Sequence, residues 1–137
     1  MVKFTVHGEI MGKPRPRFNK SGRVWTPSKF KDYEGRIAQA YEDAGGEKLE
    51  GTVAVKVRTF RAMPKTRPKR LKREEDVYKP DADNILKLVL DALNGVAYDD
   101  DKQVVRVICA KMPRARREEF LEVEVATTSD EEIGANL

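Results

Sequence analysis

The segment from Asp83 to Asn94 is the strongest constraint on the fold of this chain. Apolar residues recur in it at helical spacing and cover most of the circumference: Ile85, Leu86, Leu88, Val89, Leu90, Ala92 and Leu93. Gly95 follows and is well suited to end a helix. A short helix with so narrow a polar stripe has to be buried, so we expect it to pack against the other elements of a domain.

Four segments with strand patterns flank this helix in the sequence: residues 2–7, 53–58, 104–112 and 120–126. The first two alternate apolar and polar residues, whereas the third is apolar on both faces. A second helix is predicted from about Phe30 to Ala44. The order β-α-β-α-β-β predicts an α+β fold with a mixed β-sheet and two main helices. We expect a single domain over residues 1–126 and a disordered acidic tail over residues 127–137.

The composition excludes several classes of function. A single cysteine excludes an intramolecular disulfide framework and a cysteine-rich zinc module. His7 is the sole histidine, which argues against a histidine-ligated zinc site and a Ser-His-Asp triad. No apolar run approaches the roughly 18 residues of a membrane span, and no signal-peptide pattern opens the chain. We expect a cytoplasmic protein, encoded by a bacterium or a phage, that has no membrane partner. Any catalysis by this protein should depend on carboxylates and lysines.

Positive charge is concentrated in two stretches of the sequence. Residues 13–31 contain seven lysines and arginines without an acid, and residues 56–73 contain nine without an acid, although the net charge is only +4. Surfaces normally mix their signs, so unmixed runs suggest a polyanion such as nucleic acid. The alternative is a solubilising loop and a flexible arm. The second run overlaps residues 62–80, a long aperiodic loop of a kind that is usually functional or mobile.

Two acidic clusters flank the predicted buried helix. Asp81 and Asp83 stand at its start, and Asp99, Asp100 and Asp101 stand before the next predicted strand. We expect the clusters to converge at one end of the sheet, where crowded carboxylates would repel each other unless a cation lay among them. Oxygen ligands without histidine or cysteine select Mg²⁺, Mn²⁺ or Ca²⁺. Taken alone, Asp83 could instead be a helix cap and Asp81 an exposed turn residue.

Two other ligand-binding motifs do not fit these acids. An EF-hand loop needs a polar ligand at its fifth position and glycine at its sixth. Counted from Asp81, these positions hold Ile85 and Leu86, and no glycine occupies the sixth position counted from Asp99. No glycine-rich cradle precedes the helix, so a P-loop is excluded as well.

The helix and both acidic clusters belong to three longer motifs. These are Lys79-Pro80-Asp81-Ala82-Asp83-Asn84-Ile85-Leu86-Lys87, Asp91-Ala92-Leu93-Asn94-Gly95 and Asp100-Asp101-Lys102-Gln103-Val104. With Gly12-Lys13-Pro14-Arg15-Pro16-Arg17-Phe18 and Trp25-Thr26-Pro27, they resemble the RusA-type Holliday junction resolvases from about residue 8 to residue 112. The resemblance implies a metal-dependent endonuclease that acts as a homodimer and makes paired nicks in four-way DNA junctions.

The resemblance also implies roles for individual residues. Asp81, Asp83 and Asp101 would bind Mg²⁺, with Mn²⁺ as an alternative, and Lys87 would be the catalytic lysine. Asp100 is an alternative or additional ligand, because Asp99 leaves the register of this cluster open. The bound metal would activate water and stabilise the charge that develops on the phosphate. The alternative role of Lys87 is an ion pair with a carboxylate one turn away on the same helix.

The basic residues near these motifs are candidates for DNA binding: Lys13, Arg15, Arg17, Arg67, Lys69, Arg70 and Lys79. Contacts of this kind position a duplex through its phosphates and weaken steeply with salt. Two alternatives to a junction resolvase remain at this point. One is a non-catalytic nucleic-acid-binding module whose acids bind a structural metal or pair with its own basic stretches. The other is a less selective nuclease of branched or duplex DNA that uses the same residues.

Overall fold

The computed structural model describes residues 1–14, 17–18, 24–25 and 28–130, with only the backbone at 17–18 and 24–25. The long elements are strands β1 (Val2–His7), β4 (Val53–Phe60), β6 (Val104–Lys111) and β8 (Phe120–Thr127) and helices α1 (Ser28–Asp43) and α2 (Ala82–Leu93). The short strands β2 (Arg17–Phe18) and β3 (Val24–Trp25) form one antiparallel pair, and β5 (Arg73–Glu74) and β7 (Arg114–Ala115) form another. The predicted order and α+β class are confirmed.

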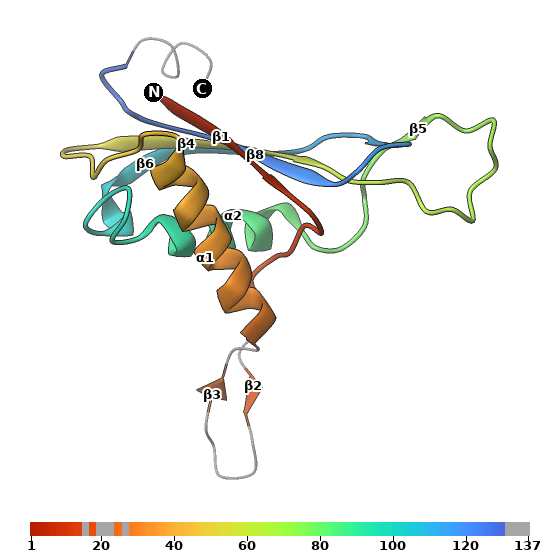
Figure 1. Cartoon of the computed structure of the whole chain (residues 1–137), viewed down its shortest axis with the longest axis horizontal. Coiled ribbons are helices and arrows are strands. Elements are labelled where there is room, and N and C mark those ends of the chain that lie inside the picture. The colour runs from red at the N-terminus through yellow and green to blue at the C-terminus, as the bar shows by residue number, and fades with distance from the viewer. Residues whose placement is uncertain (15–16, 19–23, 26–27, 131–137) are drawn as a thin grey trace.

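The four long strands form one mixed sheet in the order β1-β8-β4-β6. β8 lies antiparallel to β1 and β4, so that Val123 is placed between Phe4 and Val57, whereas β4 and β6 are parallel. Both helices cover the same face of the sheet (Figure 1). Alternation sorts the residues of β4, because its valines are buried in the core while Lys56 and Arg58 pair with glutamates of β8 on the opposite face.

Helix α2 fills the crossover between the parallel strands β4 and β6. Parallel neighbours cannot be joined by a tight turn and need a long connection, usually a helix. The side chains of α2 that face the core are Ile85, Leu88, Val89, Ala92 and Leu93. Since α2 returns the chain to the start of β6, its own first turn lies near the ends of β4 and β6 (Figure 1).

Strand β6 is more exposed than its apolar sequence suggests. It lies at the edge of the sheet and has β4 as its one strand neighbour in the described part of the chain. The side chains of Val105 and Val107 are among the exposed large hydrophobic groups, at 55% and 44%. The sequence is apolar on both faces, but an edge position leaves part of both faces uncovered.

The predicted boundary at residue 126 falls one residue before the end of β8. The backbone N–H of Thr128 donates to the carbonyl of Thr52 at 3.0 Å, and the ammonium group of Met1 pairs with Asp130 at 2.9 Å. Residues 127–130 are therefore attached to the sheet. Residues 131–137 of the predicted tail lie outside the described residues.

The long loop between β4 and α2 extends past the end of the sheet as an arm (Figure 1). We call residues 62–75 and 112–117 the basic arm, because they contain nine lysines and arginines and two acids. Pairing of β5 with β7 joins its two segments. The guanidinium group of Arg116 donates to the carbonyls of Pro68 at 2.8 Å and Arg67 at 3.2 Å. The arm is thus built from segments that are about 40 residues apart, which the local pattern could not indicate.

Residues 8–14 pack against the start of α2. The N–H of Lys13 donates to the carbonyl of Asn84 at 2.8 Å. A Cβ atom on Gly12 would lie 2.7 Å from the Cβ of Pro80 and 3.1 Å from the Cβ of Asn84. Only glycine permits so close an approach of the two segments, so Gly12 sets how residues 8–14 sit on the first turn of α2.

Substitution of Gly12 by alanine should destabilise the protein by about 1–3 kcal/mol, because the added methyl group collides with Pro80 and Asn84. Thermal and urea unfolding would measure the loss. Gly35→Ala is the matched control, since Gly35 lies within α1 and a Cβ there would contact nothing within 4 Å. This control should gain about 0.5–1 kcal/mol from helix propensity. Equal behaviour of the two variants would contradict the close approach at Gly12.

Candidate functional site

A hollow of about 600 Å³ lies at the first turn of α2. Its lining includes Lys13, Lys29, Arg61, Lys79, Asp81 and Asn84, with Glu9 as a second acid. Four cations from separate segments therefore meet where the N–H groups of a helix start also favour an anion. Ligand sites of sheets with parallel strands lie outside the carboxyl ends of those strands, as this hollow does. The hollow suits a phosphate group with a carboxylate beside it.

The first acidic cluster is exposed at the start of α2. Asp81 is the N-cap residue by its backbone, since its carbonyl accepts the N–H of Ile85 at 3.1 Å. Its side chain makes no capping hydrogen bond, so the Asp81 carboxylate is open to a ligand. The carboxylate of Asp83 accepts the N–H of the next residue, Asn84, at 2.9 Å.

Lys87 is exposed one helical turn after Asp83. Its ammonium group makes no ion pair within the described residues, so the alternative role as a partner of Asp83 or Asp91 is not realised. The side chains of Lys87 and Asp83 are both exposed to solvent on this helix.

The second cluster contains one carboxylate that is less engaged than the others. Asp99 pairs with Lys48 at 3.1 Å, and Asp100 caps the short 3₁₀ helix Asp101–Gln103 by accepting the N–H of Lys102 at 3.0 Å. This backbone hydrogen bond is the main cause that lowers the pKa of Asp100. The hydrogen bond with Asp100 is in turn the main cause that raises the pKa of Asp101. Because Asp99 pairs with Lys48 and Asp100 caps the 3₁₀ helix, these contacts favour Asp101 over Asp100 as a ligand residue.

Gln103 fixes the loop that carries this second cluster. Its amide oxygen accepts the N–H groups of Asp99 at 2.9 Å and Asp100 at 3.2 Å. Its amide nitrogen donates to the carbonyls of Leu49 at 3.1 Å and Gly51 at 2.9 Å, in the connection that precedes β4. An amide has both donors and acceptors, which explains why glutamine suits this position between two backbone segments.

The expected convergence of the two acidic clusters within one chain is wrong. They lie at opposite ends of α2 (Figure 1), whose 12 residues span about 18 Å. After Asn94 the chain turns within a few residues and enters β6 at that same end, so no element returns the second cluster to the first. Over the residues that the structure describes, no group of three or more His, Cys, Asp or Glu side chains could hold a metal ion.

Two cations predicted to bind DNA are instead engaged by the protein. The ammonium group of Lys13 lies 2.8 Å from Glu34 and 3.1 Å from Asp91. Burial opposes the charged form, but the hydrogen bonds to both carboxylates raise the pKa of Lys13 above its usual value. The guanidinium group of Arg67 donates to Glu74 at 3.3 Å and to the hydroxyl of Tyr78 at 2.9 Å.

The other residues predicted to bind DNA either have no partner within the described part of the protein or lie outside the described residues. The side chains of Lys69, Arg70 and Lys79 are exposed and make no hydrogen bond or ion pair with another described residue. Arg15 lies outside the described residues, as does the side chain of Arg17. The free cations are therefore the best candidates for phosphate contacts.

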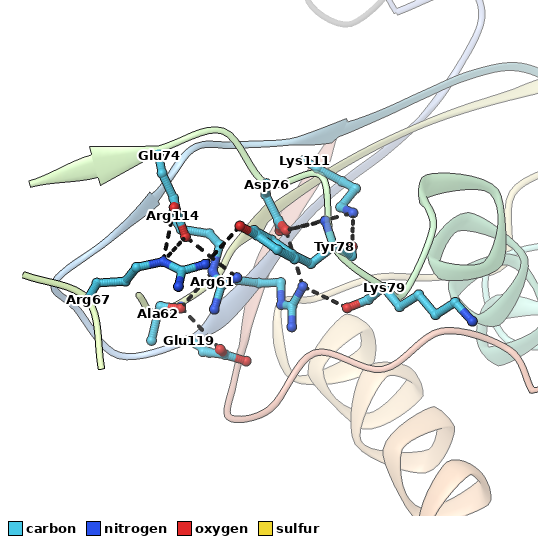
Figure 2. A network of polar contacts seen from close by, with 10 residues as sticks. All are labelled: Arg61, Ala62, Arg67, Glu74, Asp76, Tyr78, Lys79, Lys111, Arg114 and Glu119. Atoms are coloured by element: carbon cyan, nitrogen blue, oxygen red, sulfur yellow. Dashed lines mark hydrogen bonds and ion pairs between the residues drawn. The ribbon is translucent and has the colours of Figure 1, made fainter. Parts of the chain in front are cut away.

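A buried polar cluster beside the hollow was not predicted from the sequence (Figure 2). The side chain of Asp76 is fully buried, and its carboxylate lies 3.2 Å from Arg61 and 3.8 Å from Lys111. Arg61 directly follows β4, and Lys111 is the last residue of β6. The sequence signal that could have identified this cluster is the position of Arg61 and Lys111, because each is a charged residue at the carboxyl end of a parallel strand.

The structure gives no catalytic role to Cys109. Burial is the main cause that raises the pKa of the Cys109 thiol to about 11, with Asp83 adding to the effect, so this thiol is protonated at neutral pH and is a poor nucleophile.

Within the described ranges, no helix has both the length and the hydropathy that crossing a membrane requires.

Comparison with known proteins agrees with the motifs. Residues 7–126 match the family described as endodeoxyribonuclease RusA. YqaN, an uncharacterized protein of Bacillus subtilis (strain 168), is 35% identical over 122 residues, which cover 80% of this chain and 86% of that protein. The family match contains both acidic clusters, the basic arm and Arg61. The resemblance predicted from the motifs is confirmed: the chain belongs to the RusA endodeoxyribonuclease family.

Proposed function

We propose that this protein is a metal-dependent, structure-selective DNA endonuclease that resolves four-way junctions by paired phosphodiester hydrolysis, in DNA recombination and repair. The observation that carries the proposal is the exposed Asp81 carboxylate among four cations at the first turn of α2, in a chain of the RusA family. A module that only binds DNA has no use for exposed carboxylates facing a phosphate, because like charges repel. The acids therefore favour a nuclease over a binding module.

The donor chemistry of the acids fits Mg²⁺, with Mn²⁺ as an alternative. Asp81, Asp83 and Asp101 supply only carboxylate oxygens, which hard divalent cations prefer. When bound, such an ion activates water and stabilises the charge that develops on the phosphate. Asp100 is a weaker candidate because its side chain already caps the 3₁₀ helix.

The cationic residues at the hollow would place the DNA. Lys79 is exposed and lines the hollow with Asp81, so a backbone phosphate bound by its ammonium group would lie beside the carboxylate. Lys87 lies on the same helix, one turn after Asp83, and has no ion-pair partner among the described residues, so its ammonium group can offset negative charge on the substrate. The free cations of the basic arm would bind the duplex further from the cleaved bond.

We expect the active form to be a homodimer. Within one chain α2 separates the two acidic clusters, so a site that contains Asp81, Asp83 and Asp101 requires a second copy of the chain. The β6 edge offers a surface for that copy, since Val105 and Val107 are exposed on the strand that begins directly after Asp101–Gln103. Two sites of this kind would suit paired nicks in a two-fold symmetric junction.

The first test uses an end-labelled four-way junction and a linear duplex of matching sequence, each with Mg²⁺ and with EDTA. We expect paired nicks near the crossover of the junction, only in the presence of metal. Equal cleavage of both substrates would keep the metal mechanism and remove the selectivity. Tight junction binding without cleavage, in Mg²⁺ or Mn²⁺, would leave a binding module instead.

A subunit-mixing experiment tests the shared site. Asp83→Asn and Asp101→Asn should each abolish cleavage, and Asp83→Asn should leave the Tm unchanged or higher because it relieves repulsion between carboxylates. If each site combines acids from two chains, dimers mixed from the two variants hold one intact site. Cleavage should then return to about a quarter of the wild-type rate, as single nicks. No recovery after verified subunit exchange would show that each site belongs to one chain.

The basic arm can be tested through the salt dependence of DNA affinity. Replacing Lys69 or Arg70 by glutamine should weaken junction binding and reduce the slope of log K against log [salt] by about 0.9 for each lost phosphate contact. Fluorescence anisotropy over a range of KCl concentrations would measure the slope. Lys3→Gln is the control, because Lys3 lies on β1 and pairs with Glu122 on the sheet. An unchanged slope in both arm variants would contradict their role.

A further inference from the structure

Several buried polar groups near the hollow lack a hydrogen-bond partner. Among the described residues, the buried side-chain atoms without a partner include Oγ1 of Thr59, Nε of Arg61 and Oδ2 of Asp76. Thr59 and Lys111 are direct neighbours across the β4–β6 pair, so the unpartnered atoms gather around one place in the fold. Leaving such groups unpaired in the interior costs stability. Packing alone would be better satisfied by apolar residues, which suggests a different reason for this cluster.

Asp76 and its two cations fix the chain immediately before the exposed acid of the hollow. The N–H of Tyr78 donates to the Asp76 carboxylate at 3.4 Å, and Lys111 donates to the carbonyl of Tyr78. Arg61 donates to the carbonyl of Lys79 at 2.8 Å through the same nitrogen that contacts Asp76. Figure 2 shows these contacts converging on the backbone of Tyr78 and Lys79.

Residues 76–79 are therefore held by the ends of two parallel strands, and Pro80 and Asp81 follow at once. Arg61 and Lys79 both line the hollow together with Asp81. The side chain of Asp76 is 0% exposed, and those of Arg61 and Lys111 are 16% and 13% exposed. A displacement of this segment would move Lys79 and the start of α2 together, and misplacement of about 1 Å can cost about a hundredfold in rate.

We propose that Asp76 is a positioning residue: together with Arg61 and Lys111 it holds residues 78–79 and so sets the place of Lys79 and Asp81 in the hollow. The inference rests on the proposed nuclease function for its rate effect, but its structural part stands on the contacts alone. Asp76 does not touch the substrate, because its side chain is fully buried. Its effect is exerted through the backbone that leads into α2.

The test compares Asp76→Asn with the wild type and with Glu42→Gln. Asparagine keeps the shape of Asp76 but removes the charge between two cations. Glu42 is an exposed residue of α1, away from the hollow and the basic arm, and its side chain makes no hydrogen bond or ion pair with another described residue. Lys111→Met is the second variant, because it removes the donor to the Tyr78 carbonyl and keeps the Asp76–Arg61 contact. It serves as the test if Asp76→Asn does not fold.

Three quantities would be measured on each folded variant. Hydrogen exchange followed by mass spectrometry reports the freedom of residues 76–84, single-turnover cleavage of the junction reports the reacting geometry, and anisotropy in EDTA reports DNA affinity. In Asp76→Asn we expect faster exchange confined to residues 76–84, cleavage slowed by about tenfold or more, and a Kd within about threefold of wild type. Glu42→Gln should match the wild type in all three.

The outcomes separate the inference from the function on which it rests. Unchanged exchange in residues 76–84, or cleavage within about twofold of wild type, would overturn the positioning role of Asp76. Faster exchange throughout the protein, with cleavage and DNA affinity lost together, would show a general stabilising role and overturn it as well. If the wild type cleaves no branched or duplex DNA, the proposed function fails, and the exchange data still decide whether Asp76 holds this segment.

Discussion

The parallel pairing of β4 with β6 is the constraint on which the rest of the structure depends. Parallel strands need a crossover, and the crossover here contains residues 62–75 of the basic arm and the most apolar helix of the chain. Because α2 runs back along the sheet, its first turn meets the ends of both strands. Arg61, Lys111 and Asp81 are brought to one place by this topology, although 50 residues separate the first two in the sequence. The same topology sends the acids at 99–101 to the far end of α2.

Charge pairing divides the basic residues into a group that stabilises the structure and a group that remains exposed to solvent. Lys13, Arg61, Arg67 and Arg114 contact carboxylates of the protein, and these contacts hold residues 8–14, the segment before α2 and the basic arm in place. Other lysines and arginines of the arm stay free within the described structure and carry its positive field. A partly buried ion pair fixes the geometry of the chain, because separating its partners would leave a charge unpaired away from water. A solvated cation, in contrast, remains available to bind a phosphate.

Much of the fold could be predicted from local patterns. Alternation in residues 53–58 and helical spacing in residues 83–94 identified a strand and a helix, because periodicity reports which face each element buries. The exposure of β6 could not be predicted in this way, since the same valines suit a central or an edge strand. The roles of the cations were equally hidden. A lysine in a basic run looks the same whether it meets Glu34 or solvent.

The sequence by itself determined the elements, the α+β class, the family and the types of residue at the candidate site, because spacing and side-chain chemistry are local properties. Only the tertiary structure decided which of those residues meet. It placed the clusters of Asp81 and Asp101 at opposite ends of one helix, and it brought Asp76 between the ends of two strands. The physical reason is that contacts between distant segments depend on strand order and helix direction. No pattern within a single segment contains that information.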